Sequence, residues 1–455
     1  MRGKRALALA KDAMLDIVAC MIAGAKDEAT LRVARAAAGW GAGVCSLVGQ
    51  AGSVPAPAAA LVNGTAAHAL DYDDNFHPMA GHATAVLAPA ILALAEERRA
   101  SGHALLDAYI VGLEVQARVG EGVNLAHYER GWHSTSTIGV FGAAAACARL
   151  LGLDPKRVNA ALSLAFSMAG GSKLQFGTMA KPMHAGLAAQ HGVMAAALAA
   201  SGVTAIAEPL EGPWGFRDLF AGAGSPGFTA LPPARALAIE RYGLKAKIHP
   251  CCASAHCAID ALLSLRQEHG FSPAQVERVE VLVNRMSYDN LMYAIPRTEL
   301  EARFSMHWCM ALALLNGRLE LADFTAAALR RAEVRAWLPR IAMRHTEPGR
   351  EHPLKDNGRE PALVTVLLKD GRPLERYAQH PKGSLQAPLE AGELDAKFED
   401  CSHGRIAATP ATKLRSELGA LERITDVRSL TRLLRSAPPR RRSRPASPAA
   451  RARRR

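Results

Sequence analysis

Residues 71–82, Asp-Tyr-Asp-Asp-Asn-Phe-His-Pro-Met-Ala-Gly-His, place three carboxylates and two imidazoles within twelve positions. Ala-rich, apolar stretches lie on both sides of this block, at 61–70 and 83–90. Because burying a charge is costly unless it is paired or used, a functional site is the first interpretation of the block. A solvated loop is the alternative. These side chains suit general acid–base chemistry.

A second candidate is Lys181, which precedes Pro182 in the run Gly177–Gly186. Proline is common in the first turn of a helix, so Lys181 is predicted at a helix N-terminus, where the helix dipole disfavours a cation. The placement is explained if Lys181 and the free backbone N–H groups bind an anion such as a carboxylate. The alternative is an exposed lysine beside a turn.

Two further histidines are weaker candidates. His256 is predicted about two turns into an apolar helix that Pro250 starts, where a structural core histidine is an equally good interpretation. Its neighbours Cys251, Cys252 and Cys257 lack the separated ligand pairs of a zinc site, so no metal is predicted there. His133 precedes the serines Ser134 and Ser136, which suit a helix cap.

The elements that must position these side chains are mostly helices. Helical periodicity covers the ranges 5–24, 56–70, 83–100, 102–122, 136–152, 156–170 and 182–201. No convincing strand precedes about residue 240. Strand patterns then follow at 276–283 and at 362–372, where an Asp-Gly turn leads to a returning strand near 376–378. Helices are predicted between them at 252–268 and 301–316, and again within 391–435.

This order predicts a mainly α fold with an inserted α+β lid. We expect a helical domain at 1–243, the lid at 244–388, helices at 389–435 that return to the helical domain, and a disordered Arg-rich tail at 436–455. The tail carries eight of the arginines behind the net charge of +13, and without it the excess is +5. Nucleic-acid binding is therefore not predicted for the folded part.

Composition gives two further expectations. No apolar run is long enough for a membrane span, and the first residues are interpreted as an amphipathic helix rather than a signal peptide. The eight cysteines form no CxxC pair and mostly lie in apolar helical sequence, which favours reduced thiols in a cytoplasmic protein.

Four of these blocks, in this order, resemble the MmgE/PrpD family, which includes metal-free 2-methylcitrate dehydratases and cis-aconitate decarboxylases. The most specific parts are Asn63-Gly64 with Leu70-Asp71-Tyr72-Asp73-Asp74, and the run Lys181–Gly186. Phe304-Ser305 and the spacing of Lys247, Pro250 and His256 add support. The resemblance covers residues 5 to 435. It implies a large helical domain formed by both chain ends, an inserted lid with the active site between them, and a homodimer.

The resemblance also implies site residues, each matched through its own motif. The catalytic positions correspond to Asp71, His82, His133, Lys181 and His256, and the substrate-binding positions to Asn75, His184 and Trp308. Two of these depart from the family pattern, because Asn75 stands where Thr is common and Trp308 replaces a tyrosine of the decarboxylases. Since an indole has no ionisable hydroxyl, Trp308 argues against cis-aconitate decarboxylation.

The function expected from these residues is cofactor-free addition or removal of water on a 2-methylcitrate- or citrate-like acid. Lys181, His256 and His82 would neutralise carboxylates, and a histidine would carry the proton, while Asp71 is either the base or the partner of a histidine. The alternatives are decarboxylation of a cis-aconitate-like acid and a non-catalytic paralogue that binds a metabolite. A magnesium-dependent diphosphate enzyme is disfavoured, because residues 1–243 hold no second acidic cluster opposite Asp71, Asp73 and Asp74.

Overall fold

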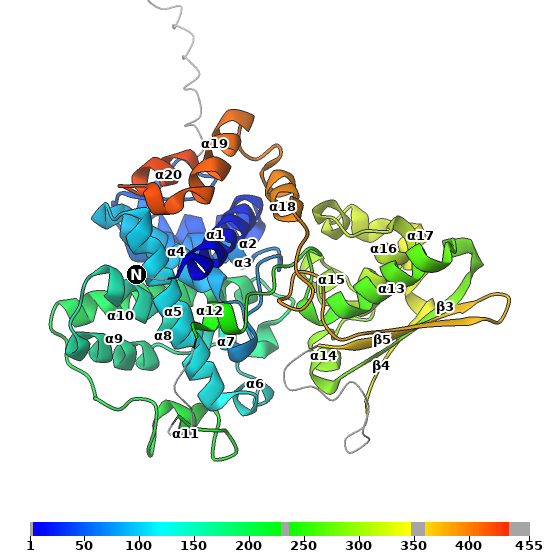
Figure 1. Ribbon diagram of the computed structural model, residues 1–455, viewed down its shortest axis with the longest axis horizontal. Helices are drawn as coiled ribbons and strands as arrows, with labels where there is room; N and C mark the ends of the chain where they lie inside the picture. Colours follow the sequence, from blue (N-terminus) through cyan, green and yellow to red (C-terminus); the bar gives the residue numbers. More distant parts are fainter. Residues whose placement is uncertain (1–2, 229–235, 347–359, 436–455) are drawn as a thin grey trace, which may run out of the picture.

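The computed structural model describes residues 3–228, 236–346 and 360–435, and these form two domains that meet side by side (Figure 1). One apolar core gathers side chains from 6–239 together with 398–434, and a second core gathers side chains from 251–368 with Phe176. The fold is mainly α with a small α+β domain, as predicted. We call the first part the helical domain and the second the lid.

The helical domain is built from an N-terminal series of helices with short connections. Its helices are α1 (Lys4–Gly24), α2 (Glu28–Ala37), α3 (Ala56–His68), α4 (Thr84–Arg98), α5 (Gly102–Val123), α6 (Ala126–Glu129), α7 (Ser134–Thr137), α8 (Gly139–Leu150), α9 (Pro155–Ser167), α10 (Ala180–Ala200), α11 (Phe216–Phe220) and α12 (Ala238–Arg241). A two-stranded antiparallel ribbon, β1 (Cys45–Ser46) with β2 (Ser53–Val54), was not predicted, because two-residue strands carry no periodic signal.

Small residues let two of these helices approach closely enough to form the site. α3 and α10 cross at Gly64 and Gly186, where a Cβ added to Gly64 would lie 2.7 Å from the Cα of Gly186. A Cβ on Gly186 would lie 2.2 Å from the carbonyl oxygen of Leu61. Both distances are shorter than any normal contact, so the crossing requires glycine on both helices. It brings the end of α3, at His68, next to the start of α10, at Lys181.

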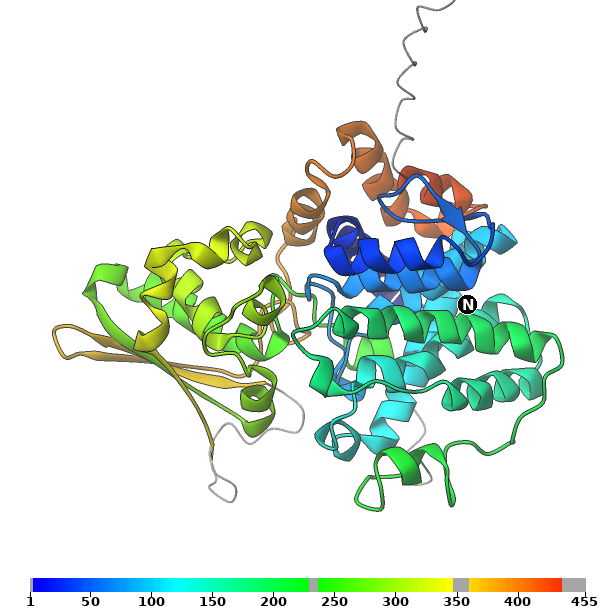
Figure 2. The same cartoon turned by 180° about the vertical axis from the view of Figure 1, so that it is seen from behind.

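The C-terminal helices return to the helical domain. They are α18 (Glu393–Ser402), α19 (Ala408–Gly419) and α20 (Arg428–Leu433), and Figures 1 and 2 show them packed beside α1 and α4. Phe398 and Leu430 join the first core. The buried ammonium of Lys397 lies 2.6 Å from Oδ1 of Asp16 on α1. This ion pair links the two chain ends.

The lid is a four-stranded sheet with helices on it. The sheet order is β4 (Ile341–His345), β3 (Val276–Val283), β5 (Ala362–Leu368), β6 (Pro373–Ala378), in which only β3 and β4 run parallel. Side chains of β5 alternate between buried and half-buried, as in a strand with one face on a core. α13 (His256–His269) and α16 (Met306–Asn316) pack against the sheet (Figure 1), and the shorter helices α14 (Arg285–Asn290), α15 (Glu299–Ala302) and α17 (Ala332–Arg335) complete the lid.

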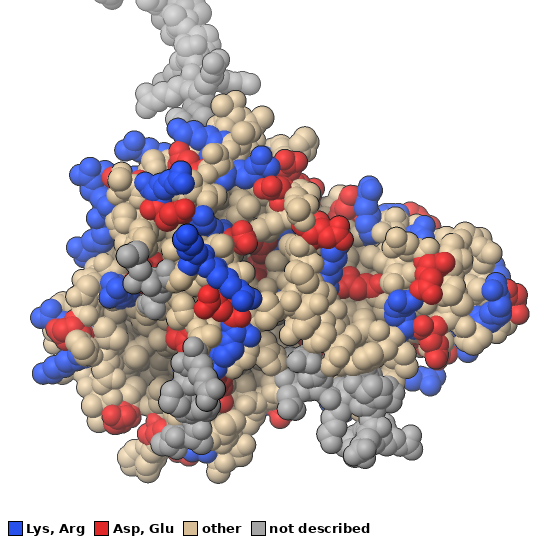
Figure 3. Space-filling model, viewed as in Figure 1, with Lys and Arg blue, Asp and Glu red and all other residues tan. Residues whose placement is uncertain are grey.

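The structure also bears on the cysteines, on membrane spans and on the distribution of surface charge. All eight cysteines are buried. No helix within the described residues is long and apolar enough to cross a membrane. Figure 3 shows Lys and Arg gathered over the α19 and α20 end of the helical domain, whereas both signs are interspersed over the lid. The Arg-rich tail at 436–455 lies outside the described residues.

Candidate active site

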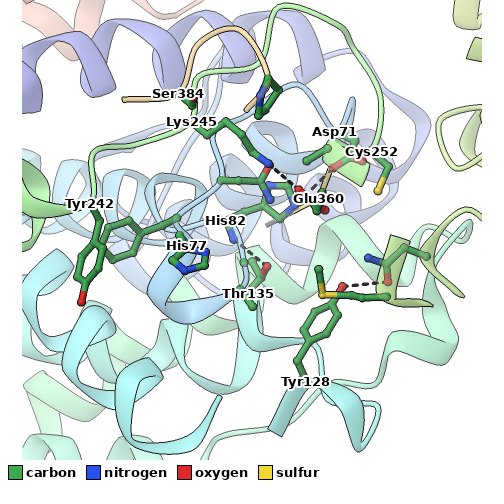
Figure 4. Close-up of a pocket in the computed structure, with 18 of the residues that line it drawn as sticks. Asp71, His77, His82, Tyr128, Thr135, Tyr242, Lys245, Cys252, Glu360 and Ser384 are labelled. Atoms are coloured by element: carbon green, nitrogen blue, oxygen red, sulfur yellow. Dashed lines mark hydrogen bonds and ion pairs between the residues drawn. The ribbon is translucent and has the colours of Figure 1, made fainter. Parts of the chain in front are cut away.

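A cavity of about 390 Å³ lies where the helical domain meets the lid, and Figure 4 shows the side chains around it. Its lining from the helical domain includes Asp71, Asn75, His82, His133 and Lys181. The lid and the junction segment contribute Lys245, Cys252, Asn290, Phe304 and Glu360. A concave, mostly enclosed space with convergent polar groups is the usual form of a small-molecule site.

Asp71 is the centre of the charged part of this cavity. Its carboxylate Oδ1 accepts from Nζ of Lys181 at 2.8 Å and from Nζ of Lys247 at 3.0 Å. Lys247 also donates to the backbone carbonyl of Asp71, at 2.7 Å. All three side chains are at most 4% exposed. Burial by itself raises the pKa of Asp71, but the two ammonium groups hold that pKa well below its ordinary value.

The backbone at Asp71 is held in an uncommon conformation. Its φ of +50° falls in the left-handed region, which non-glycine residues rarely adopt. The two lysines come from different parts of the chain, Lys181 from α10 and Lys247 from the segment that leads into the lid. Strained residues persist where the surrounding contacts fix them, and they concentrate at functional sites. The geometry therefore points to a placed carboxylate rather than a chance ion pair.

Two imidazoles share the next carboxylate, Asp73. Nδ1 of His68 lies 3.0 Å from both of its oxygens, and Nδ1 of His82 lies 3.1 Å from Oδ2. Burial lowers the pKa of His68 to about 3, and it also lowers the pKa of His82. Asp73 remains ionised, because the two rings hold its pKa well below the ordinary value against the effect of burial. The proton of His68 is thus best assigned to Nδ1, which is hydrogen-bonded to Asp73. We assign His82 the same tautomer because its Nδ1 is the ring nitrogen nearer to a carboxylate, although no aligned hydrogen bond forms there.

This assignment leaves Nε2 of His82 with a lone pair. Nε2 lies 3.6 Å from Oδ1 of Asp71, and the side chain lines the cavity (Figure 4). The backbone N–H of His82 donates to Oγ1 of Thr135, which fixes the loop that carries the ring. A neutral imidazole oriented by a buried carboxylate is the arrangement of a general base.

The third carboxylate of the block faces elsewhere. Asp74 is buried, accepts hydrogen bonds from the backbone and the hydroxyl of Thr84, and is separated from the cavity lining. Burial raises its pKa to about 7. Asp71, Asp73 and Asp74 therefore meet three different sets of partners, and they do not converge as the carboxylates of a magnesium site would.

One group in the described part of the chain has the spacing of a metal site. His68, Asp71, Asp73 and His82 each offer a ligand atom, and these atoms lie within 4.8 Å of one another. However, the same atoms already serve the Lys181, Lys247 and imidazole contacts. Because two ammonium groups compete for Asp71, this set fits a divalent cation poorly.

A hydrogen-bonded chain crosses from the helical domain to the lid along the cavity wall. The hydroxyl of Tyr128 donates to Asn290, Asn290 donates to Ser254, and Ser254 donates to Glu360 at 2.6 Å. Glu360 also accepts from Nζ of Lys245, at 2.6 Å (Figure 4). Burial alone raises the pKa of Glu360, but Lys245 and Ser254 keep it below the ordinary value.

Comparison with known proteins fits this arrangement. The model of the MmgE/PrpD N-terminal domain matches residues 3–229, and the model of the MmgE/PrpD C-terminal domain matches residues 249–423. The chain belongs to the MmgE/PrpD family. It is 29% identical to the cis-aconitate decarboxylase of Homo sapiens, over 85% of this chain and 81% of that protein.

Fungal relatives span more of the chain. A cis-aconitate decarboxylase-like protein of Aspergillus oryzae is 28% identical over 93% of this chain and 92% of that protein. The cis-aconitate decarboxylase of Aspergillus terreus is 25% identical over 93% of this chain and 91% of that protein. The relatives therefore match this member of the MmgE/PrpD family along both domains.

Five of the site residues expected from the MmgE/PrpD motifs lie on the cavity: Asp71, Asn75, His82, His133 and Lys181. The side-chain oxygen of Asn75 is buried and has no hydrogen-bond partner among the described residues. Its backbone is fixed by a two-way hydrogen bond with Lys245.

Three expected residues lie elsewhere. Trp308 is fully buried in the lid core and donates its indole N–H to the carbonyl of Asp323, so it does not line the cavity. His256 is also fully buried, is absent from the lining, and packs its ring edge-on against His249. His184 lies behind His133, with 3.1 Å between their Nδ1 atoms. The cavity lining does not include Trp308, His184 or His256, so their expected roles at the site stay predictions.

The position of His256 along the chain also differs from the prediction. It is the first residue of α13 rather than two turns inside a helix, because residues 253–255 form a 3-10 turn and Cys251 and Cys252 precede it in irregular backbone. Pro250 therefore does not start the helix. Its fixed φ suits the irregular segment as well as a helix start, so the proline alone could not distinguish them.

Sequence reasoning missed four groups that the fold brings to the site. Lys247 was used only as part of a motif, and His68, Asp73 and Glu360 were not proposed as site residues. A signal existed for His68 and Asp73, since both lie inside or beside the polar block at 71–82. Glu360 lies 115 positions from Lys245 in the sequence, and only the fold brings the two together.

Proposed function

We propose that this chain is a lyase that acts on a small di- or tricarboxylate without a cofactor, by acid–base catalysis in the cavity around Asp71 and His82. The observation that carries this proposal is the pair of ammonium groups on one carboxylate oxygen. Lys181 and Lys247 share the carboxylate of Asp71 in a buried place, and of the two lysines Lys181 lines the cavity. Such a place favours an anionic substrate group next to Lys181.

Decarboxylation of a cis-aconitate-like acid is the first reaction to test, because cis-aconitate decarboxylase is the name of relatives that match both domains. In this reaction the bond to the departing carboxylate breaks and CO₂ leaves. The electron pair forms a new carbon–carbon double bond, and the old double bond takes up a proton at its far carbon. Trp308 was expected to disfavour this reaction because an indole has no ionisable hydroxyl. Its side chain lies outside the cavity lining, so this expectation does not weigh against decarboxylation.

Dehydration of a citrate- or 2-methylcitrate-like acid is the second candidate. Loss of water needs a base at a C–H bond beside a carboxylate and an acid for the departing hydroxide. Two separate imidazole systems support it, since His82 is oriented by Asp73 while His133 contacts His184. His82 would remove the proton and then supply it to the departing hydroxide, and the neutral ring of His133 would stabilise the leaving oxygen with a hydrogen bond.

The deciding experiment uses purified, chelator-treated protein with cis-aconitate, citrate and 2-methylcitrate, followed by NMR and by CO₂ release. Release of CO₂ from cis-aconitate supports the first candidate, and metal-independent gain or loss of water supports the second. Activity that returns only after Mg²⁺ or Zn²⁺ is added would overturn the cofactor-free mechanism. Binding without turnover for all three acids would favour a metabolite-binding paralogue.

The homodimer implied by the resemblance and the cytoplasmic location expected from the cysteines stay predictions. Sedimentation velocity of the full chain tests the dimer directly, because a monomer of 48.3 kDa and its dimer are well separated. Fractionation of the source cells tests the location.

A further inference from the structure

The imidazoles of His133 and His184 meet through the same ring nitrogen. Their Nδ1 atoms lie 3.1 Å apart, and their ring centroids lie 5.3 Å apart at an angle of 50°. An imidazole nitrogen is either a donor or an acceptor. A hydrogen bond between two Nδ1 atoms therefore needs a proton on one of them and a lone pair on the other.

The surroundings keep both rings neutral. Burial lowers the pKa of His133 well below its ordinary value and that of His184 to about 4, and the nearby cation of Lys181 lowers both further. The other titratable groups that face His133 are His68 on α3 and His82 on the following loop. Two neutral rings share a single proton on the axis between their Nδ1 atoms, so the tautomer of one ring fixes that of the other.

The two rings occupy different positions relative to the cavity. His133 lines it, whereas His184 does not. His184 follows Lys181 by three residues on α10, so one helix turn brings a cation to Asp71 and an imidazole to the back of His133.

The surrounding side chains leave these rings little freedom. The backbone N–H of His133 donates to the carbonyl of Gly171, and the edge of its ring meets Phe176 with centroids 5.1 Å apart. A Cβ on Gly171 would lie 3.3 Å from Nδ1 of His184. His184 is only 7% exposed. The contact between the rings is therefore set by packing on several sides.

We propose that His184 is a positioning residue that donates its Nδ1 proton to Nδ1 of His133 and so holds the proton of His133 on Nε2. In this tautomer His133 presents a neutral N–H donor to the cavity. A donor suits an anionic substrate or a departing oxygen, whereas the opposite tautomer would present a lone pair to negative charge. This inference rests on the proposed function only for the direction of the hydrogen bond.

The tautomer can be measured without any substrate. Long-range ¹H–¹⁵N spectra of full-length protein with ¹⁵N-labelled histidine distinguish protonated from bare ring nitrogens, and His133→Gln and His184→Asn identify the two rings. We expect His133 with bare Nδ1 and protonated Nε2, and His184 with protonated Nδ1. A protonated Nδ1 on His133 overturns the proposal. Since no turnover is involved, the spectra report the tautomer whether or not the protein acts on any of the three acids.

Kinetics give a second readout. His184→Leu removes the donor and is expected to lower kcat by about 10- to 100-fold with little change in KM. His184→Asn, whose amide nitrogen takes about the place of Nδ1, should restore most of the loss. The matched control is His191→Asn, on the same helix but bonded to the carbonyl of Met168, and it should keep the wild-type kcat. Equal kcat for wild type and a folded His184→Leu would overturn the role.

Discussion

Lys181 and Asp71 are 110 positions apart in the sequence, yet Nζ of the lysine donates to Oδ1 of the aspartate at 2.8 Å in the wall of the cavity. The contact depends on the glycine crossing of α3 and α10, because Asp71 lies just beyond the end of α3 and Lys181 lies in the first turn of α10. The site is thus built where two helices touch through their backbones.

The first prediction concerns this pair. Lys181→Ala should lower kcat/KM by at least about 100-fold, because it removes the cation nearest to the developing negative charge. Lys247 should still hold Asp71 ionised, so the variant should fold, which a thermal unfolding curve checks. Lys156→Ala, at an exposed position of α9, is the matched control. A Lys181→Ala rate near that of the control would exclude the role of Lys181.

Asp73 offers a prediction about orientation rather than charge. Asp73→Asn keeps the shape of the side chain but presents an N–H group to one of the two rings. His82 should then lose its fixed tautomer, and kcat should fall by about 100-fold or more while KM changes little. Steady-state kinetics across pH 6 to 9 measure both constants. A larger change in KM than in kcat would mean that Asp73 serves substrate binding instead.

The buried neutral histidines predict how stability depends on pH. The folded-state pKa is about 3 for His68 and about 4 for His184, both below the ordinary 6.5, so the unfolded chain binds more protons as pH falls below 6.5. The contribution of these neutral histidines to the free energy of unfolding is fully present above pH 6.5. It is lost as the pH falls from 6.5 through the folded-state pKa values. Each such group changes the free energy of unfolding by up to about 1.4 kcal/mol per pH unit.

Asp74 changes the free energy of unfolding with pH in the opposite direction to these histidines. Its pKa is raised to about 7 in the fold, so its contribution is present below about pH 4 and is lost as pH rises through 7. Among the described residues eight histidines have a lowered pKa and four aspartates have a raised one, so urea unfolding should show a net loss of stability from pH 6.5 to 5. His68→Gln should flatten that slope. A slope of opposite sign would mean that the imidazoles are protonated in the fold.

Arg303 predicts how the lid is held on the helical domain. One of its guanidinium nitrogens donates to the carbonyl of Leu70, beside Asp71, at 2.9 Å and to that of Pro250 at 2.7 Å. Arg303→Met leaves both carbonyls without this donor in a buried place, so the free energy of unfolding should fall by at least about 2 kcal/mol. Activity should fall as well, because Leu70 precedes Asp71. The control Arg297→Met, on the lid surface, should change stability by less than about 0.5 kcal/mol.

The sequence by itself determined the class of fold and the chemical types at the site. Apolar periodicity located α1, α3, α4, α5, α9 and α10 and the strand β3, because these elements are long and each buries a continuous face. The polar block at 71–82 and the lysine before Pro182 indicated the site, because charge inside apolar sequence is costly without a use. Asp71, Asn75 and His82 from the block line the cavity, and so does Lys181.

Only the tertiary structure decided which side chain faces which. Asp71, Asp73 and Asp74 are near neighbours in sequence, but a left-handed residue and an irregular loop send them to the lysines, the imidazoles and Thr84. Trp308 looked like a substrate contact, yet the packing of α16 turns it into the lid core. Glu360 meets Lys245 from 115 positions away. Packing decides where a side chain points and which residues distant in sequence come into contact, and neither produces a periodic pattern in the sequence.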